Sequence, residues 1–287
     1  MTSDLTPRSS AAFTTGMRLS HHAPLHAESL LGFFAVRAVA GVEAVDGATY
    51  RRSVRLPHGP AILSIDLLDD GVNAELLLTD DSDATSAERT CRTLLDLDAE
   101  PDEVDATLAA DPLLRELVAA APGRRVPGCA DPAEIAIRAV LGQQVSVAAA
   151  RTQAARLVER CGEPLPEPVG GVTHLFPAPA ALAALDPAQL PMPRARGRAL
   201  VSLAAALAGG LDPARDRARL LALPGIGPWT ADYVAMRCGD HDVLLETDLG
   251  VRRALRRLGR PEAELQRRAE RWRPWRSYAV QHLWSVA

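Results

Sequence analysis

The sequence predicts an α+β N-terminal domain, a small antiparallel sheet with helices, followed by an all-α domain. Three segments between residues 49 and 79 alternate apolar and polar residues, as half-buried strands do. Beyond residue 121, apolar helical patterns alternate with proline and glycine breaks. The charge divides in the same way: residues 1–121 hold 9 arginines against 20 acidic residues, net −11, and residues 122–287 hold 23 against 16, net +7. We therefore place the domains at 21–121 and 122–287, after a flexible tail over 1–20.

The elements of the first part follow in chain order. Residues 1–20 are rich in Ser, Thr and Ala and show no periodicity, which is typical of a loose tail. An apolar helix is expected over 28–40. The strands are expected to be TYRRSVRL, AILSIDLL and NAELLLT, joined by the turns HGP and DDGV. Helices are then expected over 86–97 and in the stretch up to residue 121. The role of this domain is not readable from its sequence, and we expect it to stabilise the second domain.

The second domain opens with a capping box. Asp131 is the expected N-cap and Pro132 the first-turn proline of a helix that continues to about Gly142. Glu134 is expected to complete the box by accepting a hydrogen bond from the backbone N–H of the N-cap. A further helix is expected over 145–161. The helices that follow are separated by breaks at Pro164–Gly171, Pro191–Pro193, Gly209–Gly210, Gly259–Pro261 and Pro274.

The segment LPGIGPWTADY, Leu223–Tyr233, predicts a hairpin between two helices. Asp212-Pro213 opens a short helix that Pro224–Gly227 cannot continue, and the proline that follows opens a second helix. Trp229 and Tyr233 lie one turn apart on that second helix. The free N–H groups of the hairpin and the positive end of the helix dipole suit a phosphate. The alternative is a plain tight turn.

This segment, with Thr247-Asp248 downstream of it, resembles the helix-hairpin-helix Gly-Pro-Asp superfamily of DNA glycosylases. Within it, the closest resemblance is to the 3-methyladenine DNA glycosylase II (alkylbase DNA glycosylase) family. Supporting stretches are Arg125–Ala150, PMPRARGRALVSLA from Pro191, and Ala269–Trp284, and the likeness extends over residues 17–287. The resemblance implies a small sheet with helices on one face. It also implies a monofunctional glycosylase of base excision repair that acts on double-stranded DNA containing alkylated bases.

Asp248 is the candidate catalytic residue, because it occupies the aspartate position of the family. The C1′–N bond breaks with positive charge on the sugar, which a fixed carboxylate stabilises while it orients the incoming water. The alternative is that Asp248 only caps the helix that begins after it. Glu246 and Asp242 are nearby acids that the motif does not select.

A flipped nucleotide needs a pocket, and Trp229, Tyr233 and Trp284 match the pocket-lining positions of the family. Electron-rich ring faces attract a cationic N3-alkylated purine. The alternative for each ring is ordinary core packing. Leu249 is also assigned to the pocket, although the family's best-known member has a tyrosine there.

The residues expected to contact DNA come from two segments. The hairpin supplies Pro224, Gly225, Ile226, Gly227 and Thr230. Gln144 stands where the best-known relative inserts a leucine into the gap that the flipped base leaves, and it is long enough to enter the stack.

Composition excludes several other chemistries. All 32 basic residues are arginine, so a lysine Schiff base is excluded, and Trp229 stands where strand-cutting relatives carry that lysine. The four cysteines have neither zinc-site nor iron–sulfur spacing, so no metal site is predicted. No cofactor is expected, although the resemblance allows for a monovalent cation at the hairpin carbonyls. No membrane span or signal peptide is recognisable, and we expect a cytoplasmic, nucleoid-associated monomer.

Two other functions fit the same motifs. The protein could be a glycosylase for another lesion, such as uracil, hypoxanthine or a mismatched base. It could also be a non-catalytic helix-hairpin-helix module that binds distorted DNA, although the presence of Asp248 argues against this.

Overall fold

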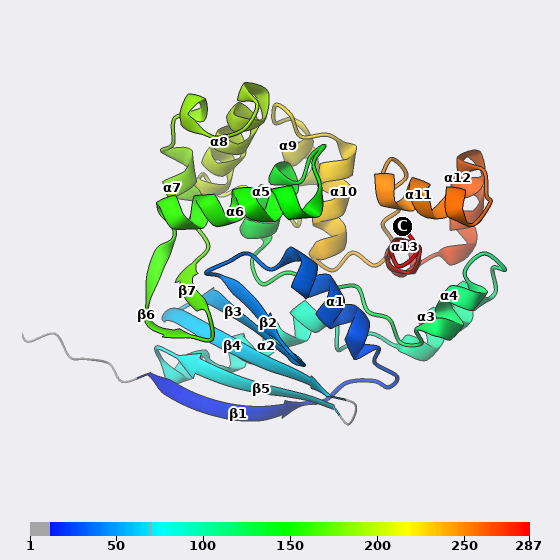
Figure 1. The fold of residues 1–287 in the computed structure, drawn as a ribbon, viewed down its shortest axis with the longest axis horizontal. Helices are drawn as coiled ribbons and strands as arrows, with labels where there is room; N and C mark the ends of the chain where they lie inside the picture. Colours follow the sequence, from blue (N-terminus) through cyan, green and yellow to red (C-terminus); the bar gives the residue numbers. More distant parts are fainter. Residues whose placement is uncertain (1–11, 69–70) are drawn as a thin grey trace, which may run out of the picture.

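An antiparallel five-stranded sheet forms one layer of the molecule in the computed structural model, which describes residues 12–68 and 71–287 (Figure 1). The strand order is β1-β5-β4-β3-β2. The strands are β1 Phe13–Leu19, β2 Glu43–Asp46, β3 Thr49–Leu56, β4 Gly59–Leu68 and β5 Gly71–Leu78. The three strands predicted from alternation are β3, β4 and β5. Residues 69 and 70 of the predicted DDGV turn lie outside the described residues.

The predicted tail over residues 1–20 is wrong for β1. This strand pairs with β5 along its whole length, from Phe13 opposite Leu78 to Leu19 opposite Val72. The segment FTTGMRL has little alternation of its own, and the free edge of β5 supplies the hydrogen-bond partners that order it. The remaining part of the predicted tail, residues 1–11, lies outside the described residues.

Two helices, α1 Ala27–Arg37 and α2 Ala84–Leu95, pack on one face of this sheet. Alternate residues of β4 and β5 face them, and Phe34 of α1 stacks on Tyr50 of β3 with ring centroids 4.2 Å apart. A sheet covered by helices on one face confirms the predicted α+β architecture.

The opposite face of the sheet receives a β-hairpin, β6 Glu163–Val169 and β7 Val172–Leu175. Leu165, Val172 and Leu175 pack there against Ile62 of β4. The hairpin corrects the all-α prediction for residues 122–287. Prolines donate no backbone hydrogen bond, so in the sequence this segment resembles a break between two helices. In the structure its leucine and valine side chains cover the sheet.

The remaining helices form two groups. They are α3 Pro101–Ala109, α4 Arg115–Ala120, α5 Pro132–Leu141, α6 Val147–Cys161, α7 Pro179–Ala183, α8 Arg194–Ala208, α9 Arg217–Leu221, α10 Pro228–Arg237, α11 Leu249–Arg257, α12 Leu265–Ala269 and α13 Arg276–Trp284. Helices α5 to α10 share one core. Helices α11 to α13 share another with α3 and α4 (Figure 1).

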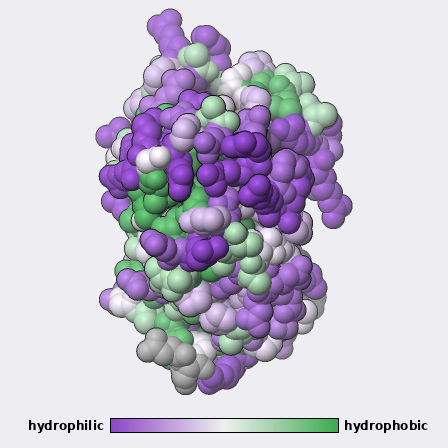
Figure 2. Space-filling view, turned by 90° about the vertical axis from the view of Figure 1, so that its right-hand side faces the viewer, coloured by the Kyte–Doolittle hydropathy of each residue, from purple (hydrophilic) through white to green (hydrophobic). Residues whose placement is uncertain are grey.

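The face that carries α11 to α13 is mostly hydrophilic, with apolar side chains visible at mid-height (Figure 2). None of the helices in the described ranges is long and apolar enough to cross a bilayer.

Two local predictions need correction. Asp131 does cap α5, accepting from Ala133 N at 2.7 Å, but Glu134 does not complete the capping box because its carboxylate binds Arg52. Asp212 accepts from Ala214 N in a turn, and the first hairpin helix begins only after Asp216. In both places a polar side chain has taken a partner other than the one that its local spacing indicates.

Candidate active site

The hairpin between α9 and α10 has a conformation that requires glycine. Gly225 has φ +78°, and a Cβ there would lie 2.7 Å from the Cβ of Ala199. Gly227 is the N-cap of α10, which begins at Pro228. The backbone therefore turns tightly against α8 and presents the N-terminal end of α10 to the surface.

Gln143, which the sequence analysis did not select, fixes this hairpin. Its Nε2 donates to the carbonyl of Gly225 and to Oγ1 of Thr230, both at 2.9 Å. Thr230 is buried, and so is Ile226, whose N–H donates to the carbonyl of Leu223. Of the residues assigned to DNA contact, Ile226 and Thr230 thus contribute side chains to the packing of the hairpin.

Asp248 is held by three hydrogen bonds from two sides. Its Oδ1 accepts from Val251 N at 2.9 Å, which caps α11, and from Trp284 Nε1 at 2.8 Å. Its Oδ2 accepts from Trp229 Nε1 at 3.0 Å. Hydrogen bonds to an ionised carboxylate are short and strong, so three of them fix the direction of the group. Asp248 therefore caps α11 and lines the cleft at the same time, so the capping role does not exclude the catalytic one.

Three aromatic rings continue from this carboxylate. Trp229 stacks on Tyr233 with centroids 5.4 Å apart and planes at 11°, and the centroids of Tyr233 and Trp284 are 6.4 Å apart. Trp284 approaches α11 at Gly250, where a Cβ would lie only 2.9 Å from the indole Cδ1. The absence of a side chain at this glycine lets the indole reach Asp248.

These groups line an open cleft of about 780 Å³. Trp229, Tyr233, Asp248 and Trp284 all line it, and the hairpin contributes Gly225, Gly227 and Thr230. The structure thus brings the predicted catalytic and pocket residues into one space. Pro224 and Ile226 are not among the lining residues.

Two predicted residues lie at the mouth of the cleft. Leu249 is 66% exposed, directly after Asp248. Gln144 is exposed between α5 and α6 and has φ +56°, which is uncommon for a residue with a side chain. Strained backbone of this kind concentrates at functional sites.

Two arginines that the sequence analysis missed contact the aromatic wall. The guanidinium carbon of Arg37, at the end of α1, lies 3.8 Å from the ring centroid of Phe33 and 5.9 Å from that of Trp284. Arg237 donates to the hydroxyl of Tyr233 at 2.9 Å and to two backbone carbonyls before α5. Burial would raise the pKa of Tyr233, but Arg237 and Arg37 outweigh it and lower that pKa. Arg37 could not be found from its sequence because α1 lies nearly 200 residues before the motif.

No group of three potential metal ligands is present among the residues that the structure describes. Cys129 and Cys238 lie with their sulfurs 3.7 Å apart, as free thiols. The two cysteines are 109 residues apart in the sequence, so this contact could not be predicted from their spacing.

Comparisons with known proteins give two family matches. Residues 16–131 match the AlkA N-terminal domain, and residues 137–277 match the HhH-GPD superfamily base excision DNA repair protein family. Among solved structures, 3-methyladenine DNA-glycosylase from Archaeoglobus fulgidus has the same fold, with TM-score 0.79, 22% identity and coverage of 94% of this chain and 97% of that one.

Curated relatives are similar at higher identity. The probable bifunctional transcriptional activator/DNA repair enzyme AlkA of Mycobacterium tuberculosis is 47% identical over 96% of this chain, which spans 58% of the length of that relative. DNA-3-methyladenine glycosylase 2 of Escherichia coli is 38% identical over 89% of this chain and 92% of its own length. The chain belongs to the DNA-3-methyladenine glycosylase 2 (AlkA) family of the HhH-GPD superfamily.

Proposed function

We propose that this protein is a monofunctional DNA glycosylase that removes alkylated purines, including 3-methyladenine, from double-stranded DNA. The observation that carries the proposal is the carboxylate of Asp248, held between the indoles of Trp229 and Trp284 at the wall of a cleft beside the hairpin. Names of the relatives in the same family support this substrate class.

Each part of the site has a task in this reaction. The hairpin and the N-terminus of α10 bind the DNA backbone through N–H groups and the helix dipole. The target nucleotide leaves the base stack and enters the cleft, where its base lies against Trp229, Tyr233 and Trp284. As the C1′–N bond breaks, Asp248 stabilises the positive sugar and orients the water that replaces the base. With no lysine in the chain, the product is a free base and an uncut abasic strand.

A second substrate class, neutral deaminated purines such as hypoxanthine, is favoured by Arg37. Its positive charge lies 5.9 Å from the ring centroid of Trp284, at the wall of the proposed base pocket. The same charge stabilises the electron density that a neutral purine takes with it on leaving. Mass spectrometry of free bases released from methylated and deaminated duplexes separates the two classes.

Replacement of the carboxylate tests the proposal. Asp248→Asn keeps a residue that caps helices well but removes the charge, so single-turnover release of 3-methyladenine should fall by about 100-fold or more. Binding to an undamaged duplex should change by less than about twofold, because the phosphate contacts remain. Glu246→Gln is the matched control, since the exposed Glu246 bonds Gln266 and should leave release unaltered. Unchanged release in Asp248→Asn would remove Asp248 from the mechanism, whereas a wild-type protein that releases no base would favour a DNA-binding module instead.

A further inference from the structure

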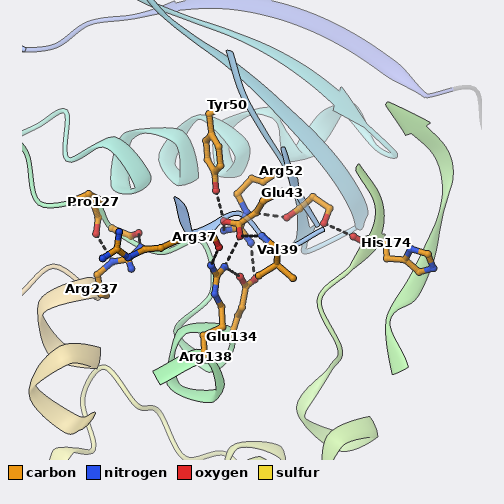
Figure 3. Close-up of polar contacts among 12 residues, drawn as sticks. Arg37, Val39, Glu43, Tyr50, Arg52, Pro127, Glu134, Arg138, His174 and Arg237 are labelled. Atoms are coloured by element: carbon orange, nitrogen blue, oxygen red, sulfur yellow. Dashed lines mark hydrogen bonds and ion pairs between the residues drawn. The ribbon is translucent and has the colours of Figure 1, made fainter. Parts of the chain in front are cut away.

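A buried cluster of four charged side chains joins the sheet to helix α5 (Figure 3). Arg52 Nη2 lies 2.7 Å from Glu134 Oε2, and Arg138 Nη1 lies 2.8 Å from both Glu134 Oε1 and Glu43 Oε2. Glu43, Arg52 and Glu134 are each at most 6% exposed. Two positive and two negative charges thus compensate one another between β2, β3 and α5.

Glu43 and Arg138 stay ionised at neutral pH. Burial raises the pKa of Glu43, but Arg138 and Arg52 outweigh it, so that the pKa lies below its usual value. Burial lowers the pKa of Arg138, and Glu43 and Glu134 reverse this and raise it. Buried ion pairs are often no more stabilising than apolar residues of the same volume. Their presence here therefore calls for a role other than stability.

Two members of the cluster also hold the chain where α1 ends. Arg138 Nη2 donates to the carbonyl of Arg37 at 2.8 Å, and Glu43 Oε2 accepts from Val39 N at 3.0 Å (Figure 3). A carbonyl and an N–H two residues apart are thus bound to one pair of opposite charges. The backbone between them is fixed in both position and direction.

The same short segment lines the cleft. Arg37, Val39 and Arg138 are among the cleft residues, and the Arg37 side chain extends over Phe33 towards Trp284. Arg52, in contrast, contacts Glu134, Glu43 and the carbonyl of Ser53, and it makes no hydrogen bond or ion pair with the end of α1 among the described residues. Within one cluster, therefore, Arg138 bonds the segment that lines the cleft, whereas Arg52 bonds the two glutamates and its own strand.

We propose that Arg138 is a positioning residue for base excision, which together with Glu43 fixes the end of α1 so that Arg37 lies beside Trp284. The inference rests on the proposed function. It gives the N-terminal sheet a role in the reaction, because β2 supplies Glu43 and α1 supplies Arg37. Arg138 acts through Arg37 and need not touch the base.

Lysine substitutions at the two arginines test this proposal. Arg138→Lys keeps the charge but cannot bond Glu43, Glu134 and the Arg37 carbonyl together, so single-turnover release of the alkylbase should fall by about tenfold. Arg52→Lys also conserves the charge, at a side chain that is more deeply buried (4% exposed, against 16% for Arg138), and should lower release by less than about threefold. In an Arg37→Met background, Arg138→Lys should add less than about twofold, since its effect passes through Arg37. Equal losses in the two lysine variants, or fully additive losses with Arg37→Met, would mean that the cluster is only structural.

Amide hydrogen exchange gives a readout that does not depend on activity. Exchange in residues 37–41 should accelerate by about tenfold in Arg138→Lys and stay near wild type in Arg52→Lys. Unchanged exchange in Arg138→Lys would overturn the positioning role, whether or not the wild type releases a base. Failure of the proposed function would instead appear as a wild-type protein that releases no base. If Arg138→Lys does not fold, Glu43→Gln replaces it in both measurements. This substitution weakens the hydrogen bond that Val39 N donates to the side chain of Glu43.

Discussion

The indole Nε1 of Trp284 lies 2.8 Å from Oδ1 of Asp248 and donates a hydrogen bond to it. This contact joins the last helix of the described chain to the N-cap of α11. It also determines which way the carboxylate faces, because the second oxygen is held by Trp229. Trp229 and Trp284 therefore hold the acid through their indole N–H groups as well as lining the cleft.

Loss of the Trp284 donor should slow excision. Trp284→Phe keeps a ring but removes a hydrogen bond to a charged group, worth about 1.5–3 kcal/mol, so single-turnover release should fall by about 10- to 100-fold. Trp275→Phe is the matched control, because Trp275 Nε1 has no hydrogen-bond partner among the described residues. Equal losses in both variants would assign the effect to packing.

A methyl group at Gly250 should disturb the same contact. The new Cβ would lie 2.9 Å from Cδ1 of Trp284 and 3.0 Å from Oδ1 of Asp248, so one of the two must move. We expect Gly250→Ala to lower the single-turnover rate by about tenfold, although alanine favours a helix by about 1 kcal/mol. Gly32→Ala, in α1 with open space around it, should leave the rate unaltered. A fully active Gly250→Ala would show that the pair tolerates displacement.

Elements with a local signal were predictable from the sequence. Strands β3 to β5 alternate in hydrophobicity, and the Asp131-Pro132 start of α5 is a capping pattern, so both could be located without tertiary information. The β6–β7 hairpin was missed because its prolines weaken the strand signal. Strand β1 was missed because only the edge of β5 orders it.

The site was predictable as far as its motif extends. The hairpin was predicted from its own residues, and Asp248 and the aromatic residues were assigned from the resemblance of residues 223–284 to the glycosylase family. Arg37 and Gln143 could not be found in this way, since each reaches the site from a distant segment. Glu134 shows the opposite failure: its local pattern indicated a capping box, and a tertiary partner, Arg52, took its carboxylate.

The hairpin itself should be sensitive at Gly225. Alanine there would have φ +78° and a Cβ 2.7 Å from Ala199, so Gly225→Ala should displace the hairpin and weaken duplex binding by about tenfold. Gly210→Ala has similar backbone strain at φ +86° but open space around it, and should bind duplex as the wild type does. Binding is measured by titration of a labelled duplex at fixed salt. Equal affinities of the two variants for the duplex would show that the hairpin is not part of the DNA interface.

The stability of the fold should fall in mild acid because of His282. Burial, with Arg124 nearby, lowers the pKa of this histidine to about 3, so the unfolded chain binds a proton more readily than the folded one. Stability from this group is complete above the unfolded pKa of about 6.5, and about 1.4 kcal/mol is lost between about pH 7.5 and about pH 5.5. Urea unfolding of wild type and His282→Leu at both pH values measures the difference, and the variant should lose less. His241→Gln is the opposing control: Asp96 raises the pKa of His241, so protonated His241 stabilises the fold and its removal should steepen the acid loss. An identical acid loss in wild type and His282→Leu would show that His282 does not titrate on unfolding.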